Sequence, residues 1–198
     1  IMSKNLDLWL IRHGESTTNT GLWTDNPLAA PLTARGHEQA AAAAQKVTEP
    51  PALIIHSPAV RAEQSASYIR ELWPQVPTRV WPIEEIIYLS AAKIQNLNQE
   101  ARKQYIQDYW NRADPFYCDG SDCESFATFL QRVHCFSEQV KTLSGLVIAV
   151  GHGQFFKAYL LSLQNELVAT PEGMRFFRQQ ETTHPLANSE IIHINNPE

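Results

Sequence analysis

Cysteine is scarce in this 198-residue sequence, with Cys118, Cys123 and Cys135 as its three examples. An odd number in a chain of this length argues against a disulfide scaffold and favours a reducing compartment, although Cys118 and Cys123 could pair if the chain were exported. Zinc is disfavoured too, because these cysteines and His134 fit the spacing of no common zinc site. We therefore expect no bound metal and no cofactor.

Basic residues are also few and dispersed. The sequence has 16 lysines and arginines against 21 aspartates and glutamates, which gives a formal net charge of −5. A nucleic-acid-binding protein usually presents a basic face, so we expect no nucleic-acid partner. A small anionic substrate is still compatible with this charge, because a few local cations can dominate a single pocket.

Long hydrophobic runs are missing. The longest apolar stretch, residues 146–150, is far too short to cross a bilayer, and the first residues contain no apolar segment of the signal-peptide kind. These absences predict a cytoplasmic protein without a membrane partner. The sequence does not indicate an oligomeric state.

Three common catalytic motifs are absent as well. No phosphate-binding P-loop motif occurs, and His37-Glu38 is not followed by the second histidine of a zinc-binding HExxH pattern. Residues 151–155, which include His152, contain no serine, and the nucleophile elbow of a serine hydrolase needs one. P-loop nucleotide chemistry, zinc proteolysis and serine hydrolysis are therefore disfavoured.

What the sequence does contain is an alternation of short apolar runs and helical patterns. The runs are continuous rather than alternating, which is typical of strands covered on both faces. We predict strands at 6–11, 52–57 and 145–150, weaker strands at 78–83 and 189–194, and helices at 33–46, from Ser57-Pro58 to about 73, at 124–143 and after 152. This order predicts a single α/β domain over residues 1–198, a three-layer α/β/α sandwich with a mainly parallel sheet.

Residues 86–123 differ from the rest of the chain. This stretch is polar, has a helix-prone segment and contains six aromatic residues. We interpret it as a helical lid or insertion over one edge of the sheet. Its aromatic residues could form an interaction surface, but packing into a small secondary core is the more common arrangement.

Polar side chains follow each of the three strong strands. Arg12 and His13 follow the first, Arg61 lies shortly after the second, and His152 follows the third. Ligands of open parallel sheets bind beyond the carboxyl ends of the strands. The sequence therefore predicts a cationic pocket in which two histidines and two arginines meet. Taken singly, each has a simpler interpretation as a surface or core residue, but their coincidence at three strand ends favours a site.

Such a pocket suits a phosphoryl group. Arginine binds phosphate oxygens with paired N–H groups, and histidine is a nucleophile or acid–base group near neutral pH. Gly14 and Gly153, beside the two histidines, would let backbone N–H groups approach a bound anion. Phosphoryl transfer through a phosphohistidine follows as the expected chemistry.

Five ordered segments of the sequence resemble the histidine phosphatase (phosphoglycerate mutase-like) superfamily. They are LWLIRHGEST, similar to the R-H-G-[ED] signature, then LTARGHEQA, SPAVRAEQSA, ESF with Arg132-Val133 downstream, and VGHG. Two differences from the family pattern are Gly151, where serine usually precedes the second histidine, and Leu89, where glycine usually follows the proton-donor segment.

The resemblance implies a role for each matching position. His13 would be the phosphorylated nucleophile, while Arg12, Arg61 and His152 would bind the phosphoryl oxygens with help from Asn19. The proton donor would be Glu85, with the adjacent Glu84 as the alternative. The fold implied is that of the phosphoglycerate mutases.

The resemblance further implies a phosphoric monoester hydrolase of the histidine acid phosphatase type, acting on a small phosphorylated metabolite without a metal. The interval of 139 residues between His13 and His152 (152 − 13) is shorter than in the cofactor-dependent mutases, which favours a phosphatase. A phosphoglycerate mutase and a non-catalytic protein that binds phosphorylated ligands are the alternatives. Lys93, Arg102, Lys103 and Arg112 in the lid are compatible with a second anionic group on the substrate.

Overall fold

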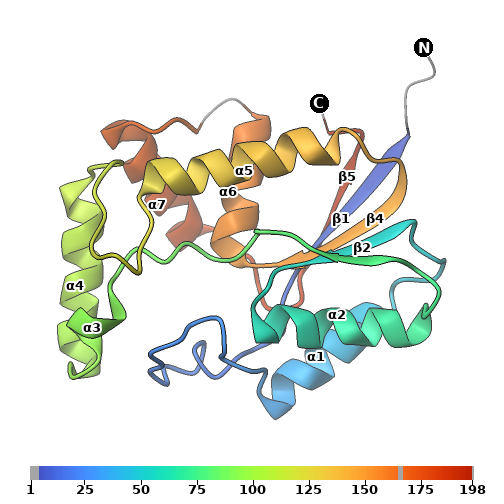
Figure 1. Cartoon of the computed structure of the whole chain (residues 1–198), viewed down its shortest axis with the longest axis horizontal. Coiled ribbons are helices and arrows are strands. Elements are labelled where there is room, and N and C mark those ends of the chain that lie inside the picture. The colour runs from blue at the N-terminus through green and yellow to red at the C-terminus, as the bar shows by residue number, and fades with distance from the viewer. Residues whose placement is uncertain (1–4, 165–166, 198) are drawn as a thin grey trace.

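A computed structural model describes residues 5–164 and 167–197 (Figure 1). Within these residues, five strands form one sheet in the order β3-β2-β4-β1-β5. The strands are β1 (Leu6–Arg12), β2 (Leu53–His56), β3 (Thr78–Val80), β4 (Gly145–Gly151) and β5 (Ile191–Asn195). The helices are α1 (Ala34–Ala44), α2 (Val60–Leu72), α3 (Ala91–Ile94), α4 (Gln99–Arg112), α5 (Phe126–Val140), α6 (Gly153–Leu163) and α7 (Pro171–Thr183).

The sheet is mainly parallel, as predicted. β4 pairs in parallel with both β1 and β2, and β2 pairs in parallel with β3, whereas β5 runs antiparallel along β1. The register of the central pair runs from Leu6 opposite Gly145 to Arg12 opposite Gly151. The carboxyl ends of β1, β4 and β2 therefore lie side by side, and the residues that follow these strands meet at one edge.

Helices cover both faces of the sheet, which confirms the three-layer arrangement (Figure 1). On one face, alanines of α1 and α2 such as Ala44 and Ala66 pack on Ile54 and Ile148, and their small side chains let the helices lie close to the strands. On the other face the core is aromatic, built from Phe126, Phe129, Phe136, Phe155 and Phe177. Both apolar layers are needed because the central strands are buried on both sides.

Residues 86–123 contain α3 and α4 and lie beyond the end of the sheet (Figure 1). Tyr109 and Trp110 of α4 are buried, and the Trp110 ring lies 5.9 Å from Phe177 of α7 and 6.3 Å from Phe126 of α5. Most of the aromatic residues here therefore extend the core, while Phe116 is exposed. That the segment acts as a lid stays a prediction.

The start of α2 differs from the prediction. The sequence predicts a helix that starts at Ser57-Pro58, but the N-cap is Ala59 and the helix begins at Val60. The Ser57 hydroxyl accepts a hydrogen bond from the Ala59 N–H at 3.1 Å and contacts His152 at 2.7 Å. Ser57 thus stabilises a turn before the helix, because its hydroxyl bonds to the Ala59 N–H and to His152 of the strand-end cluster.

Helix α7 was not predicted, although its start carries a clear local signal. Thr170 is the N-cap, its hydroxyl accepts from the Gly173 N–H at 3.0 Å, and Pro171 follows as the first helical residue. Proline at this position needs no hydrogen-bond partner for its nitrogen. Met174 and Phe177 then bury the inner side of the helix.

The loop after β1 lies directly against the first turn of α1. A Cβ atom on Gly36 would come 1.9 Å from the Glu15 carbonyl oxygen, and one on Gly14 would come 2.2 Å from the Gly36 oxygen. The Thr33 N–H donates to the same Glu15 oxygen at 2.9 Å. Two glycines therefore permit a backbone contact that fixes the chain just after His13.

We expect Gly36→Ala to lower the free energy of unfolding by about 1–3 kcal/mol, because the new Cβ would overlap the Glu15 oxygen. Urea denaturation followed by tryptophan fluorescence measures the change. Gly153→Ala is a matched control, since Gly153 also lies in the first turn of a helix and its Cβ would come no closer than 3.4 Å to Arg12. Equal stability of Gly36→Ala and wild type would contradict the close contact.

Candidate active site

The residues predicted to meet at the strand ends do so. The backbone N–H of His13 donates to the Gly151 carbonyl at 2.9 Å, which continues the β1–β4 pairing by one residue. The next residue of the neighbouring strand end is His152, and the two imidazole rings lie 5.0 Å apart. Both side chains are buried, with 2% of His13 and none of His152 exposed.

Hydrogen bonds fix the proton position on His13. The Nδ1 atom lies 2.6 Å from the Gly14 carbonyl, which can only accept, so Nδ1 carries the hydrogen. The Arg61 Nε donates to His13 Nε2 at 3.1 Å, so Nε2 presents its lone pair. Burial lowers the pKa of His13 to about 3, helped by the charge of Arg61, and the ring is neutral at neutral pH.

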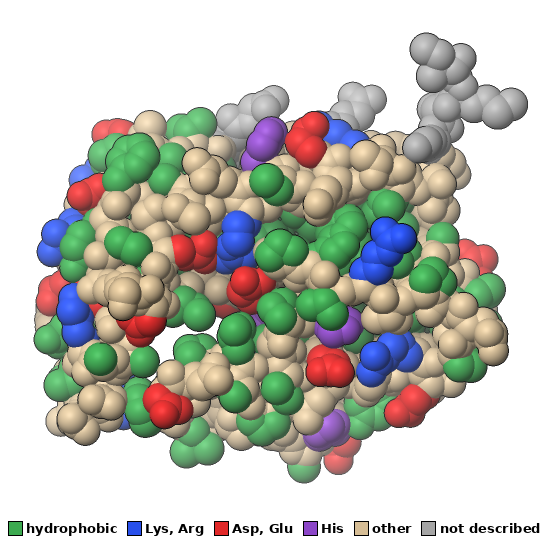
Figure 2. All heavy atoms as spheres, viewed as in Figure 1, with side chains coloured by type: hydrophobic (Ala, Val, Ile, Leu, Met, Phe, Trp, Pro, Cys, Tyr) green, Lys and Arg blue, Asp and Glu red, His purple; other side chains and the backbone are tan. Residues whose placement is uncertain are grey.

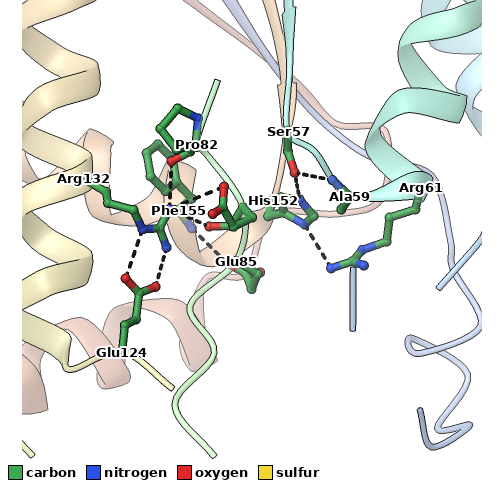
Figure 3. A network of polar contacts seen from close by, with 10 residues as sticks. Ser57, Ala59, Arg61, Pro82, Glu85, Glu124, Arg132, His152 and Phe155 are labelled. Carbon is green, nitrogen blue, oxygen red and sulfur yellow. Dashed lines mark hydrogen bonds and ion pairs between the residues drawn. The ribbon is translucent and has the colours of Figure 1, made fainter. Parts of the chain in front are cut away.

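His152 has the opposite arrangement of its two nitrogens. Its Nε2 lies 2.7 Å from the Ser57 hydroxyl, and its Nδ1 accepts from Arg61 at 3.2 Å (Figure 3). Because guanidinium cannot accept, the hydrogen of His152 is on Nε2. Burial, followed by the charges of His13 and Arg61, lowers the pKa of His152 well below its usual value.

Arg61 therefore joins the two imidazoles through separate nitrogens, and its third nitrogen donates to the Pro27 carbonyl. Its position as the second residue of α2 directs the side chain along the strand ends. Burial lowers the pKa of Arg61 and of Arg12, with the negative charge of Glu85 acting in the other direction. Guanidinium nevertheless stays protonated in proteins, so both groups are fixed positive charges.

Arg12 has an unsatisfied donor. Its Nη1 donates to the Leu186 carbonyl, but its Nε is buried without a hydrogen-bond partner among the described residues. Gly153 lies against this nitrogen, since a Cβ on Gly153 would come 3.4 Å from it. A buried donor on a cation is costly to leave unpaired, so the atom indicates a place for an anion.

Glu85 lies at the first turn of α6. Its carboxyl oxygens accept from the N–H groups of Gln154 at 3.2 Å and Phe155 at 3.0 Å. These bonds and the two arginines favour the charged form, but burial outweighs them and raises the pKa of Glu85 to about 7. The carboxyl can therefore hold a proton near neutral pH beside two cations.

Glu84 is not brought into this cluster. Its carboxylate lies 3.9 Å from Arg132 Nη1, and the Arg132 side chain donates to the Glu84 carbonyl. Arg132 also donates to the Pro82 carbonyl and to both carboxylate oxygens of Glu124 (Figure 3). Arg132 of α5 thus holds the segment that carries Glu85. Arg132 belongs to one of the family-like segments of the sequence, but its contact with residues 82–84 has no signal in the local sequence.

The remaining predicted residues surround the cluster. The Asn19 side-chain oxygen accepts from Ser16 and from Asn188 at 3.2 Å, which ties together the loop after β1 and the approach to β5. Gly14 does not offer its N–H to an anion, contrary to our expectation, because that N–H donates to the Ser65 hydroxyl at 3.1 Å. Gly14 serves the contact with α1 instead.

Two cavities open beside Glu85. One, of about 200 Å³, is lined mainly by charged and polar residues, among them Arg12 and Lys157, and also by Gly153. The other, of about 270 Å³, adjoins Arg61 and is mainly apolar. The described residues contain no group of three or more histidine, cysteine, aspartate or glutamate side chains that could hold a metal ion. Within the same residues, no helix is long and apolar enough to cross a membrane.

A sequence model of the histidine phosphatase superfamily (branch 1) matches residues 8–184. The chain belongs to this superfamily. The match includes every residue of the strand-end cluster, from Arg12 to His152. A search of curated proteins finds no match.

Solved structures of this superfamily's fold resemble the chain over nearly its whole length. A putative alpha-ribazole-5′-P phosphatase from Escherichia coli K-12 has a TM-score of 0.70 at 21% identity, covering 96% of this chain and 90% of its own. Alpha-ribazole phosphatase from Shigella flexneri gives 0.70 at 24%, covering 95% and 89%. The mycobacterial glucosyl-3-phosphoglycerate phosphatase gives 0.68 at 22%, covering 97% and 91%. At these identities the comparison establishes the phosphoglycerate mutase-like fold.

The structure explains why this superfamily member has glycine before its second histidine. A Cβ on Gly151 would come 2.7 Å from the Phe156 ring and 3.3 Å from Ile83. Phe156 is fully buried against the strand, so its ring takes the space that a serine side chain would need. Glycine at position 151 therefore leaves the space that the Phe156 ring needs to pack in the aromatic layer.

We expect His13 to make stability depend on pH. Its folded-state pKa of about 3 lies below the ordinary 6.5, so its contribution is complete above about pH 6.5 and is lost as pH falls toward 3. His13→Gln should reduce the stability lost between about pH 7.5 and pH 5 by about 2 kcal/mol. Urea denaturation at both pH values measures this difference.

The control is His184→Gln at an exposed position, which should keep the wild-type loss between the two pH values. If His13→Gln and wild type lose the same stability on acidification, the buried neutral imidazole is not the state of His13.

Proposed function

We propose that the chain is a phosphomonoesterase that acts through a phosphohistidine at Nε2 of His13 and hydrolyses a small phosphorylated metabolite. The observation that carries this proposal is the state of His13. It is buried and neutral, its hydrogen is held on Nδ1 by Gly14, and its Nε2 lone pair faces the guanidinium of Arg61. A nucleophilic imidazole needs this arrangement.

The first step forms a bond from His13 Nε2 to phosphorus and breaks the bond from phosphorus to the alcohol oxygen. Arg61 must leave Nε2 and donate to the phosphoryl oxygens instead, together with the unpaired Nε of Arg12. Two guanidinium groups then stabilise the charge spread over the transferring group, and this positive charge needs no metal to supply it.

Glu85 transfers a proton in each of the two steps. Protonated Glu85 gives its hydrogen to the departing alcohol oxygen, which avoids a free alkoxide. Water then attacks the phosphohistidine and returns a proton to Glu85, while the nitrogen–phosphorus bond breaks and phosphate leaves. A pKa near 7 suits a group that must act as acid and then as base around neutral pH.

The named activities of the structural neighbours support the class of substrate. Those proteins are named as phosphatases of alpha-ribazole-5′-P and of glucosyl-3-phosphoglycerate, both small phosphorylated metabolites. A non-catalytic ligand-binding protein would have no need of Glu85 with its raised pKa. The mutase alternative would need further cations beside the cluster, and those of residues 86–123 do not line the two cavities next to Glu85.

His13→Ala tests the nucleophile. We expect kcat/KM for 4-nitrophenyl phosphate, measured with a chelator present, to fall at least about a thousandfold. Brief reaction with labelled phosphate ester followed by alkaline quenching should trap an acid-labile phosphoenzyme in wild type and none in the variant. His184→Ala, at an exposed residue, is the control and should behave as wild type. Undiminished hydrolysis by His13→Ala would remove the assignment.

Glu85→Gln tests the proton donor. For 2-phenylethyl phosphate, whose alcohol is a poor leaving group, wild-type kcat/KM should fall above about pH 7 as Glu85 loses its proton. The variant should lose about a hundredfold and show no such decline. With 4-nitrophenyl phosphate, whose leaving group needs little protonation, the loss should be small. Similar losses for the two esters would argue against proton donation by Glu85.

A further inference from the structure

The cavity beside Arg61 and Glu85 has an apolar wall. Apart from those two residues, its lining comes mainly from the side chains of Leu28, Ile86, Tyr88, Leu89, Ile94 and Ile106, and we call it the apolar cavity. They come from three separate segments: the loop after β1, the chain after β3, and helices α3 and α4. Figure 2 shows a hollow between the α3–α4 segment and the loop after β1, with hydrophobic side chains at its rim.

Its position makes the apolar cavity the space next to the scissile bond. Among the described residues that line it, the charged ones are Arg61, which contacts His13, and Glu85, the proposed proton donor. A phosphoryl group held by Arg61 and Arg12 would therefore direct its alcohol portion either here or into the smaller polar cavity on the Arg12 side. Glu85 must reach the alcohol oxygen, and it borders both spaces.

The cations of residues 86–123, which are the candidates for recognising a second anionic group, lie outside the apolar cavity. Lys157 also lies outside it and lines the cavity on the Arg12 side. Lys93 is paired with Asp119 at 2.9 Å, and the Arg112 guanidinium lies 3.9 Å from the Tyr117 ring. Arg102 donates to the Leu97 carbonyl, and Lys103 lies 3.8 Å from Glu100.

Hydroxyl partners are scarce in the same wall. The Thr18 hydroxyl lies 2.9 Å from that of Ser16, and Tyr88 carries the one other side-chain hydroxyl among the described residues that line the cavity. A sugar or a carboxylate placed here would lose most of its hydrogen bonds to water without replacement, which is costly. An alkyl or aromatic group would gain from burial.

We propose that the substrate is the phosphate ester of an apolar alcohol, alkyl or aromatic, without a second anionic group. The proposal rests on the phosphatase activity inferred above and names its substrate class. The volume of about 270 Å³ is at the lower end of cavities that hold small ligands, so it suits a short alkyl chain or one or two rings. Selectivity then comes from burial of the alcohol portion.

A series of linear alkyl phosphates from ethyl to hexyl tests this proposal. We expect kcat/KM to rise about fourfold for each added methylene until the cavity is filled. Glycerol phosphate, glucose 6-phosphate and 3-phosphoglycerate should be poorer substrates than hexyl phosphate by at least about tenfold. A flat series, or 3-phosphoglycerate as the preferred ester, would overturn the apolar substrate class while leaving the phosphatase activity intact.

Ile94→Asn connects the selectivity to this wall. Ile94 is partly exposed on the short helix α3, so the polar replacement should be tolerated by the fold. We expect the rise per methylene to drop from about fourfold to about twofold. Val168→Asn, at an exposed apolar residue outside the cavity, is the matched control and should keep the wild-type series. An unchanged series in Ile94→Asn would place the alcohol elsewhere.

Binding of alkylphosphonates, measured by titration calorimetry, examines the cavity without any chemistry. Their affinity should rise with chain length as the kcat/KM values do. Absence of ester hydrolysis by wild type would overturn the proposed function, whereas phosphonate affinity without chain-length dependence would overturn the apolar cavity as a binding site. The two failures are therefore distinguishable.

Discussion

A single buried guanidinium group holds the strand ends of this protein together. Arg61 donates to both imidazoles, and each of these bonds decides which nitrogen of its histidine keeps a lone pair. A second set of contacts then places the hydrogens, with the Gly14 carbonyl on one ring and the Ser57 hydroxyl on the other. This arrangement is supported by the start of α2 at Val60, by the close backbone contact at Gly14 and Gly36, and by the turn at Ser57.

Burial shifts the pKa values of His13 and Glu85 in opposite directions. It lowers the pKa of His13 to about 3 and raises that of Glu85 to about 7, because in each case the uncharged form is favoured. Between these values the imidazole is unprotonated and the carboxyl is protonated. One cause, removal of water, thus suits His13 and Glu85 to the proposed roles of nucleophile and acid over the same pH range, while the guanidinium charges persist.

The main features of the fold and the cluster follow from short-range patterns. Continuous apolar runs identified β1, β2 and β4, and parallel pairing then required the residues after them to meet. The roles now proposed for Arg12, His13 and Glu85 came from the family resemblance. Ser57-Pro58 was misread as a helix start because the histidine that contacts Ser57 lies 95 residues later. The functions of Gly14 and Arg132 likewise depend on partners far along the chain, which no local pattern contains.

The aromatic packing of α4 has a consequence for recognition. Tyr109 and Trp110 pack this helix against α5 and α7. Tyr88, which lines the apolar cavity, contacts the same two rings, tilted against Tyr109 and edge-on to Trp110. Part of the wall around the alcohol portion is thus continuous with the hydrophobic core and is already ordered before any ligand arrives. These side chains lose little conformational entropy when a ligand binds. Little of the binding free energy gained from shape complementarity on that side is therefore offset.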